Sequence, residues 1–258
     1  MRHALNAEWT KLRTLSSTSW LLLAAAALTV AVSAAAAAAT SCPAGHCAED
    51  PAKISFTGIY LGQAVVAVLA VTVISGEYGT CMIRLTLAAM PGRISVLAAK
   101  AATLTGLVLL TGAIAVAGSL LAGRALLTGH GFTPAHGYPA LTLGDGPVLR
   151  AAIGSALYLA LIALLSLGVA TVIRDPAPAI GTVLGLLYLD PIIAAVLHDA
   201  HWHNIIERYA PMTAGLAIQA TTNLSSLPIS PWAGLGVLAA WAAGALLLGG
   251  LMFRIRDA

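Results

Sequence analysis

The sequence predicts an all-α polytopic membrane protein with six transmembrane helices and a short N-terminal amphipathic interfacial helix. Of its 258 residues, 59% are hydrophobic and only 9% are charged, whereas a soluble domain carries about 25% charged residues. The charges are clustered, and long windows between them hold none. The alternation of apolar and polar residues that marks membrane β-strands is missing. These observations exclude a soluble enzyme, a disordered chain and a nucleic-acid-binding domain.

A helix needs about 20 apolar residues to cross a bilayer. Five windows without charge meet this length, and a sixth does so although it contains Asp190. Asp175-Pro176 and Ser230-Pro231 precede two of the spans, and a capping residue followed by proline is a typical helix start. The predicted spans are Trp20–Thr40, Ser55–Ser75, Ala101–Gly123, Leu149–Ile173, Ala177–Leu197 and Trp232–Phe253.

The basic residues predict the orientation of these spans. With six spans, both termini lie on one side, which then carries nine Lys and Arg residues against four on the other. Because cytoplasmic loops are enriched in Lys and Arg, we expect a multi-pass protein of the plasma membrane with both termini in the cytoplasm. Residues 1–258 form a single transmembrane domain in this interpretation.

The segment before the first span has an amphipathic pattern. Three apolar residues recur on one helical face and three charged residues lie largely on the other: Leu5, Trp9 and Leu12, then Glu8, Lys11 and Arg13. This pattern fits a helix lying on the inner membrane surface, with the tryptophan at headgroup level. It equally fits an ordinary basic flank of a first span.

The cytoplasmic loop 76–100 is the most informative stretch. Residues 83–90 read as a short helix that Pro91-Gly92 ends, and Arg84 and Arg93 make the loop basic. The apolar residues, among them Leu87, need a surface to pack on, which is lipid, the chain's own bundle or a partner. A solvated linker is the alternative.

The outer loops hold two groups with possible chemistry. Cys42 and Cys47 flank a Pro- and Gly-containing turn, which suits either a disulfide or two free thiols outside the membrane, and His46 alone does not complete a zinc site. Three histidines cluster near the last outer segment: His198, His201 and His203. We interpret them as part of an interfacial loop, so no metal is expected. A small membrane-embedded enzyme that uses this cluster is the alternative.

Within the spans, the acidic residue is Asp190, which precedes Pro191. A carboxylate at mid-membrane costs about 2.5–3.5 kcal/mol on insertion scales. Asp190 therefore either caps a kinked half-helix or lies on the pathway of an ion-driven transporter that needs no ATPase.

No Gly-x-x-x-x-Gly-Lys-Ser/Thr loop is present, so this chain does not bind ATP by that route. The segments Glu8–Thr14 and Glu77–Thr80 nevertheless resemble those of type-2 ABC exporter permeases of actinobacteria. Further matching positions are Ile83-Arg84-x-Thr86-Leu87, Pro91-x-Arg93, Ala99-Lys100 and, more loosely, Arg208-Tyr209-x-Pro211. Cys81-Met82 departs from the family, where a small residue is more usual.

The resemblance covers the whole chain and implies a transport subunit rather than an enzyme. It implies a second permease copy, as a homodimer or heterodimer, and a separate ABC ATPase subunit that binds ATP and Mg²⁺, so this chain carries no cofactor. It places the contact with the ATPase on the N-terminal helix and the 76–100 loop, through Glu8, Trp9, Lys11, Arg13, Glu77, Arg84, Leu87, Pro91 and Arg93. The cargo is not indicated.

Overall fold

The computed structural model describes residues 7–11, 14, 16–42, 49–80, 82–89, 92–132, 141–196 and 200–255. The described residues are helical and contain no strand, which confirms the all-α prediction. Six helices are long and apolar enough to cross a membrane. They are α2 (Ser16–Ala39), α4 (Ile59–Gly79), α6 (Arg93–Leu127), α7 (Gly146–Ile173), α8 (Pro176–Val196) and α11 (Pro231–Ile255).

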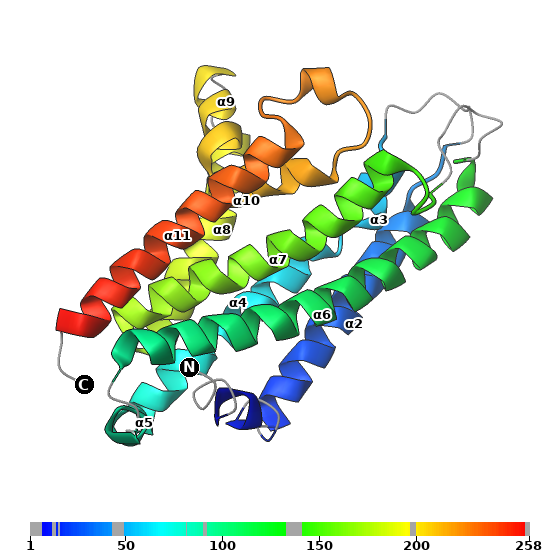
Figure 1. The fold of residues 1–258 in the computed structure, drawn as a ribbon. Helices are drawn as coiled ribbons and strands as arrows, with labels where there is room; N and C mark the ends of the chain where they lie inside the picture. The colour runs from blue at the N-terminus through cyan, green and yellow to red at the C-terminus, as the bar shows by residue number, and fades with distance from the viewer. Residues whose placement is uncertain are drawn as a thin grey trace.

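The six long helices form one bundle and alternate in direction (Figure 1). Residues 7–11, the short helix α5 (Met82–Ala89) and the last turn of α11 lie at one end, called here the α5 end. The opposite end, called the α9 end, carries α3 (Pro51–Ser55), η1 (Thr128–His130), α9 (Ala200–Tyr209), α10 (Pro211–Leu216), η3 (Ala217–Gln219) and η4 (Leu224–Ser226). The first and last described residues, 7 and 255, therefore lie at the same end, as expected for six alternating spans.

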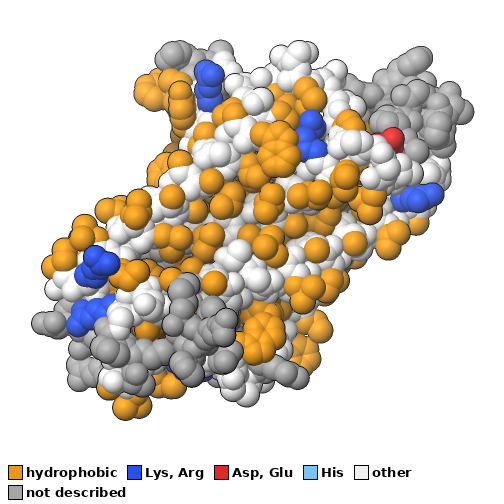
Figure 2. Space-filling view, viewed as in Figure 1, with side chains coloured by type: hydrophobic (Ala, Val, Ile, Leu, Met, Phe, Trp, Pro, Cys, Tyr) orange, Lys and Arg blue, Asp and Glu red, His pale blue; other side chains and the backbone are white. Residues whose placement is uncertain are grey.

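The outer surface of the bundle fits a lipid environment. On the face in Figure 2, apolar side chains cover the middle and the Lys and Arg side chains lie toward the two ends. Large apolar residues such as Leu110, Leu121 and Leu247 are more than half exposed along the spans. Leaving this much apolar surface uncovered is unfavourable in water, which indicates a multi-pass membrane protein.

Helix α7 is the centre of the bundle. It packs on α4, α6, α8 and α11, and it fully buries large side chains, among them Tyr158, Ile162 and Leu165. By contrast, α8 lies at the edge of the bundle, and only 17% of its apolar stretch Pro176–Ile193 is buried. Helices α2 and α4 pack closely at Gly58 and Gly62, where the absence of a side chain makes room. A Cβ atom added at these glycines would lie only 1.8 and 2.0 Å from atoms of α2.

Three boundaries differ from the sequence-based prediction, each for a local reason. The second span begins at Ile59 because Asp50 caps the separate short helix α3. The loop 76–100 is much shorter than expected, since α4 continues to Gly79 and α6 begins at Arg93. Helix α8 continues through Pro191, so Asp190 does not cap a separate half-helix.

Two elements between α8 and α11, namely α10 and η3, are folded back into the bundle. Met212 and Ile218, from α10 and η3, are buried, and both elements pack against α7 and α11. Small residues make this possible: a Cβ at Gly154 of α7 would lie 2.0 Å from Ile218, and one at Gly234 of α11 would lie 2.0 Å from a backbone oxygen of α10.

Candidate functional site: an ion-pair network at the α5 end

Residues 7–11 are helical, but the face that they bury is not the predicted one. Glu8 is only 1% exposed, whereas Trp9 is 48% exposed. The prediction that Glu8 lies on a solvent-facing polar side is therefore wrong. The carboxylate points into the bundle because two lysines meet it there, and Arg13 lies outside the described residues.

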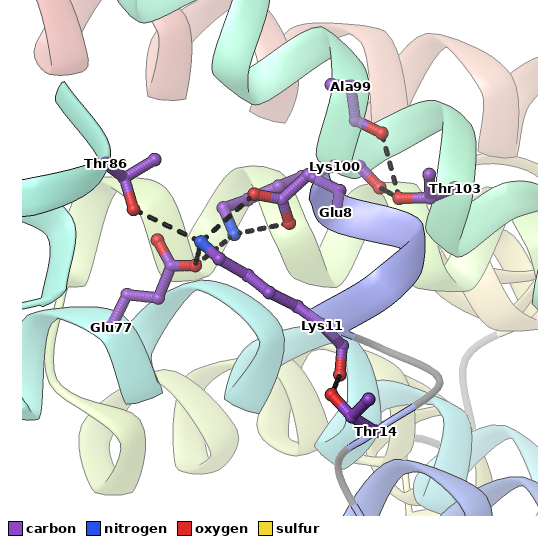
Figure 3. A network of polar contacts seen from close by, with 8 residues as sticks. All are labelled: Glu8, Lys11, Thr14, Glu77, Thr86, Ala99, Lys100 and Thr103. Carbon is purple, nitrogen blue, oxygen red and sulfur yellow. Dashed lines mark hydrogen bonds and ion pairs between the residues drawn. The ribbon is translucent and has the colours of Figure 1, made fainter. Parts of the chain in front are cut away.

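The network consists of Glu8, Lys11, Glu77, Thr86 and Lys100 (Figure 3). Lys100 of α6 donates to Glu8 Oε2 at 2.8 Å and to Glu77 Oε1 at 2.6 Å. Lys11 donates to Glu77 Oε1 at 3.0 Å, to Thr86 Oγ1 of α5 at 3.2 Å and to Glu8 Oε1 at 3.5 Å. Four chain segments, namely residues 7–11, α4, α5 and α6, are thereby joined through charged groups.

The network is neutral as a whole, with two carboxylates and two ammonium groups. Lys100 and Glu8 are each 1% exposed. Removing either side chain would leave a buried charge of opposite sign without one of its ion-pair partners, which is destabilising. Burial lowers the pKa of Lys11, but its hydrogen bond to Glu77 and the charges of Glu8 and Glu77 outweigh this, so the pKa is raised from 10.5. Lys11 is therefore charged at neutral pH.

The short helix α5 has one face turned inward and one outward. Ile83 and Thr86 are buried, whereas Met82 is 43% and Leu85 72% exposed. The two members of each pair are three residues apart, which places them on the same face of a helix. Leu87 packs partly against the core, so Met82 and Leu85 are the more exposed of these apolar side chains. The Arg84 side chain and Pro91 lie outside what the structure describes.

Arg93 makes a contact within the bundle that the sequence does not indicate. Its guanidinium donates to the backbone oxygens of Phe253 at 3.0 Å and Arg254 at 3.5 Å. These carbonyls belong to the last described turn of α11. Arg93 thus fastens the start of α6 to the end of α11.

Comparison with protein-family models finds no match, and comparison with curated proteins finds none either. The resemblance to exporter permeases is therefore still a prediction from the matching sequence segments.

The predicted sites at the α9 end are only partly described. Cys42 is disulfide-bonded, while Cys47, the expected partner, lies outside the described residues. His198 is also outside them, and for His201 and His203 only the backbone, in α9, is described. Among the residues that the structure describes, no three His, Cys, Asp or Glu side chains gather in a way that could hold a metal ion.

Sequence reasoning missed the role of Asp50. Its carboxylate accepts from the backbone N–H groups of Ala52 and Lys53 at the start of α3. It also accepts from the N–H and hydroxyl of Thr221 and from the N–H of Thr222. Asp50-Pro51 is a recognisable helix start, but nothing in the pattern indicates the partner 171 residues away.

Proposed function

We propose that this chain is the membrane permease subunit of an ATP-driven ABC exporter, driven by a separate ATPase subunit bound at the α5 end. The observation that carries the proposal is the network, because it connects elements at the surface to elements of the bundle. Residues 7–11 and α5 lie at the α5 end, and Lys11 and Lys100 tie them to α4 and α6.

The proposed mechanism is a mechanical coupling. An ATPase that presses on α5 moves Thr86 and hence Lys11, which shares the oxygen Oε1 of Glu77 with Lys100. Glu8, Glu77 and Lys100 are buried and charged, so separating them is costly, and residues 7–11, α4 and α6 move together rather than slip. The link from α5 is the hydrogen bond between Thr86 and Lys11. Displacement of α5 would then tilt α4 and α6, two of the spans around a translocation pathway formed with a second permease copy.

The proposed contact with the ATPase centres on Leu85 and Met82. Burying an exposed leucine contributes about 1.5–3 kcal/mol, and Leu85→Asp would remove this and place a charge in the interface. A change of 1.4 kcal/mol is tenfold in affinity, so binding should weaken at least about tenfold.

The matched control is Leu143→Asp, since Leu143 is also half exposed but lies before α7 at the α9 end. Tagged chain is purified from its native membrane, and co-purifying ATP hydrolysis is measured for wild type and both variants. We expect hydrolysis with wild type and Leu143→Asp and little with Leu85→Asp. The proposal would be contradicted if no ATP hydrolysis co-purified with wild type, or if both variants retained the same amount of co-purifying ATP hydrolysis.

The proposed orientation places the α5 end in the cytoplasm. Over the whole sequence, nine Lys and Arg residues belong to this side and four to the other, in line with the positive-inside rule. A membrane-impermeant maleimide applied to intact cells should label a cysteine placed at Ser226 and not one placed at Thr80, relative to the parent chain. Labelling of Thr80→Cys from outside would reverse the assignment.

A further inference from the structure

We propose that a groove between α6 and α11 at the α5 end binds one acyl chain of an anionic phospholipid, while Arg254 holds the phosphate of its headgroup. The proposal does not depend on the exporter function. It starts from a cavity whose described walls are apolar except for one cationic side chain at the outer end.

The groove has a volume of about 580 Å³, which lies within the size range of ligand sites. Helix α6 forms one wall and helix α11 the other. The lining residues on which the argument depends are Leu97, Ala98 and Ala101 of α6, and Leu246, Gly250 and Arg254 of α11.

Gly250 keeps the space between the two helices open. A Cβ added there would lie 3.5 Å from Ile94 Cδ1 and 3.7 Å from Leu97 Cδ2, which are ordinary van der Waals distances. Its neighbour Gly249 differs, because a Cβ at that position would lie only 2.8 Å from the backbone oxygen of Gly168 in α7. Gly249 is therefore needed for close helix packing, whereas Gly250 faces the groove and α6.

The length of the groove fits an acyl chain of one leaflet. Leu246 and Arg254 are eight positions apart on α11, which at a rise of 1.5 Å per residue is about 12 Å. One leaflet of the hydrocarbon core is about 15 Å thick, half of the full 30 Å. A transmembrane helix of a second copy would extend well beyond the inner end of such a groove.

The charge at the outer end fits an anionic headgroup. Arg254 is exposed and lines the groove, and among the described residues no Asp or Glu forms an ion pair with it. Arg93 brings a second guanidinium to the same turn of α11, since it donates to the backbone oxygen of Arg254 at 3.5 Å. Guanidinium groups match the geometry of phosphate oxygens.

The two parts of the site lie where a phospholipid has its own two parts. On the face in Figure 2, Lys and Arg side chains at the α5 end adjoin the apolar surface of the bundle. Basic pockets between transmembrane helices at this level bind anionic headgroups. A choline headgroup would add a further cation beside Arg93 and Arg254, whereas phosphatidylglycerol would not, so the site should select the anionic lipid.

The test compares phosphatidylglycerol with phosphatidylcholine of the same acyl chains. The full-length chain is reconstituted in nanodiscs with equal amounts of the two lipids, and the lipid that stays bound after release is identified by native mass spectrometry. We expect phosphatidylglycerol to be retained about fivefold over phosphatidylcholine, the factor that corresponds to about 1 kcal/mol per basic residue near the surface. Excess inorganic phosphate should not displace it, because phosphate does not occupy the apolar groove.

Arg254→Gln tests the headgroup contact, since it removes the charge but keeps a long polar side chain. Arg124→Gln is the matched control, because Arg124 is also exposed but lies in the last turn of α6 at the α9 end. We expect Arg254→Gln to retain the two lipids equally and Arg124→Gln to keep the preference.

Gly250→Leu tests the groove, since its side chain would enter the space between α6 and α11. Gly236→Leu is the matched control on the same helix: a Cβ at Gly236 meets nothing within 4 Å, and Gly236 does not line the groove. We expect Gly250→Leu to lose the retained phosphatidylglycerol and Gly236→Leu to keep it. Ala98→Leu, on the opposite wall, replaces Gly250→Leu if that variant does not fold.

Four results would overturn the proposal. The first is equal retention of the two lipids by wild type, or retention of neither. The second is a preference that survives in Arg254→Gln or in both groove-filling variants, which would place the lipid elsewhere. The third is displacement by inorganic phosphate, which would mean that arginine alone holds the anion. The fourth is a lipid-free dimer of wild type that Gly250→Leu does not form, which would assign the groove to a second copy.

Discussion

Replacing Lys100 by methionine tests whether the network holds the α5 end together. Lys100 is 1% exposed and lies 2.8 Å from Glu8 and 2.6 Å from Glu77. Lys100→Met keeps the length of the side chain but leaves two carboxylates to a single ammonium, that of Lys11. The site then has a buried net negative charge.

The magnitude follows from two opposing contributions. At an effective dielectric of about 20, a pair of unit charges 4 Å apart attracts by about 4 kcal/mol, and Lys100 makes two such contacts at shorter range. Burying the lysine also removes its hydration, which offsets part of this attraction. In practice, removing one partner of a buried ion pair lowers the free energy of unfolding by about 3–5 kcal/mol. For a chain of this size that corresponds to a fall of roughly 6–20 °C in the unfolding midpoint.

The assay is thermal unfolding of the purified chain in detergent, followed by circular dichroism. Lys53→Met is the control, because Lys53 is exposed at the α9 end, and it should shift the midpoint by less than about 2 °C. The double variant Glu8→Gln/Lys100→Met restores neutrality around the remaining Lys11–Glu77 pair, so it should lose less than the sum of the two single variants. Equal midpoints for Lys100→Met and Lys53→Met, or strict additivity in the double variant, would refute the reasoning.

Two further predictions concern other charged groups. Asp50→Ala removes a helix cap, worth about 0.5–2 kcal/mol, and the hydrogen bonds to Thr221 and Thr222. Limited proteolysis should therefore cut the 220–230 segment faster than in wild type. Unchanged cleavage would contradict the role of Asp50. The raised pKa of Lys11 means that its contribution to stability is complete below 10.5 and is lost as pH rises above that value through the pKa of the folded state. Midpoints of wild type and Lys11→Met should therefore converge only above about pH 10.5, and convergence at lower pH would argue against the pairing with Glu8 and Glu77.

The spans could be predicted because bilayer thickness imposes a length on each apolar run. Charge-free windows located five of the six long helices, and the sixth was located by its length and its Asp175-Pro176 start although it contains Asp190. Pro91-Gly92 correctly indicated the end of a short helix over residues 82–89. The ends of the spans were harder to place. The sequence-based bounds of the loop 76–100 are too wide, because α4 continues to Gly79 and α6 begins at Arg93. Glu77 and Lys100 lie inside these two helices and pair with each other.

The network itself could not be predicted from local pattern. Its residues lie up to 92 positions apart, and periodicity within one helix carries no information about which charge on another helix will meet it. One signal was present: Lys100 stands between pairs of alanines in a long apolar helix, and a charge in such a place needs a partner of opposite sign. The capping of α11 by Arg93 and the link from Asp50 to Thr221 have no comparable signal.

The spacing of the network along the chain has a consequence for biogenesis. Glu8 leaves the ribosome 92 residues before Lys100, an interval on the order of 5–18 s at bacterial to eukaryotic rates of synthesis. During that time the first two long helices are made while Glu8 lacks its closest counter-ion. Docking of the N-terminal segment is therefore a late assembly step, completed only after the third long helix has entered the membrane, and a nascent chain arrested before Lys100 should leave this segment open to added protease.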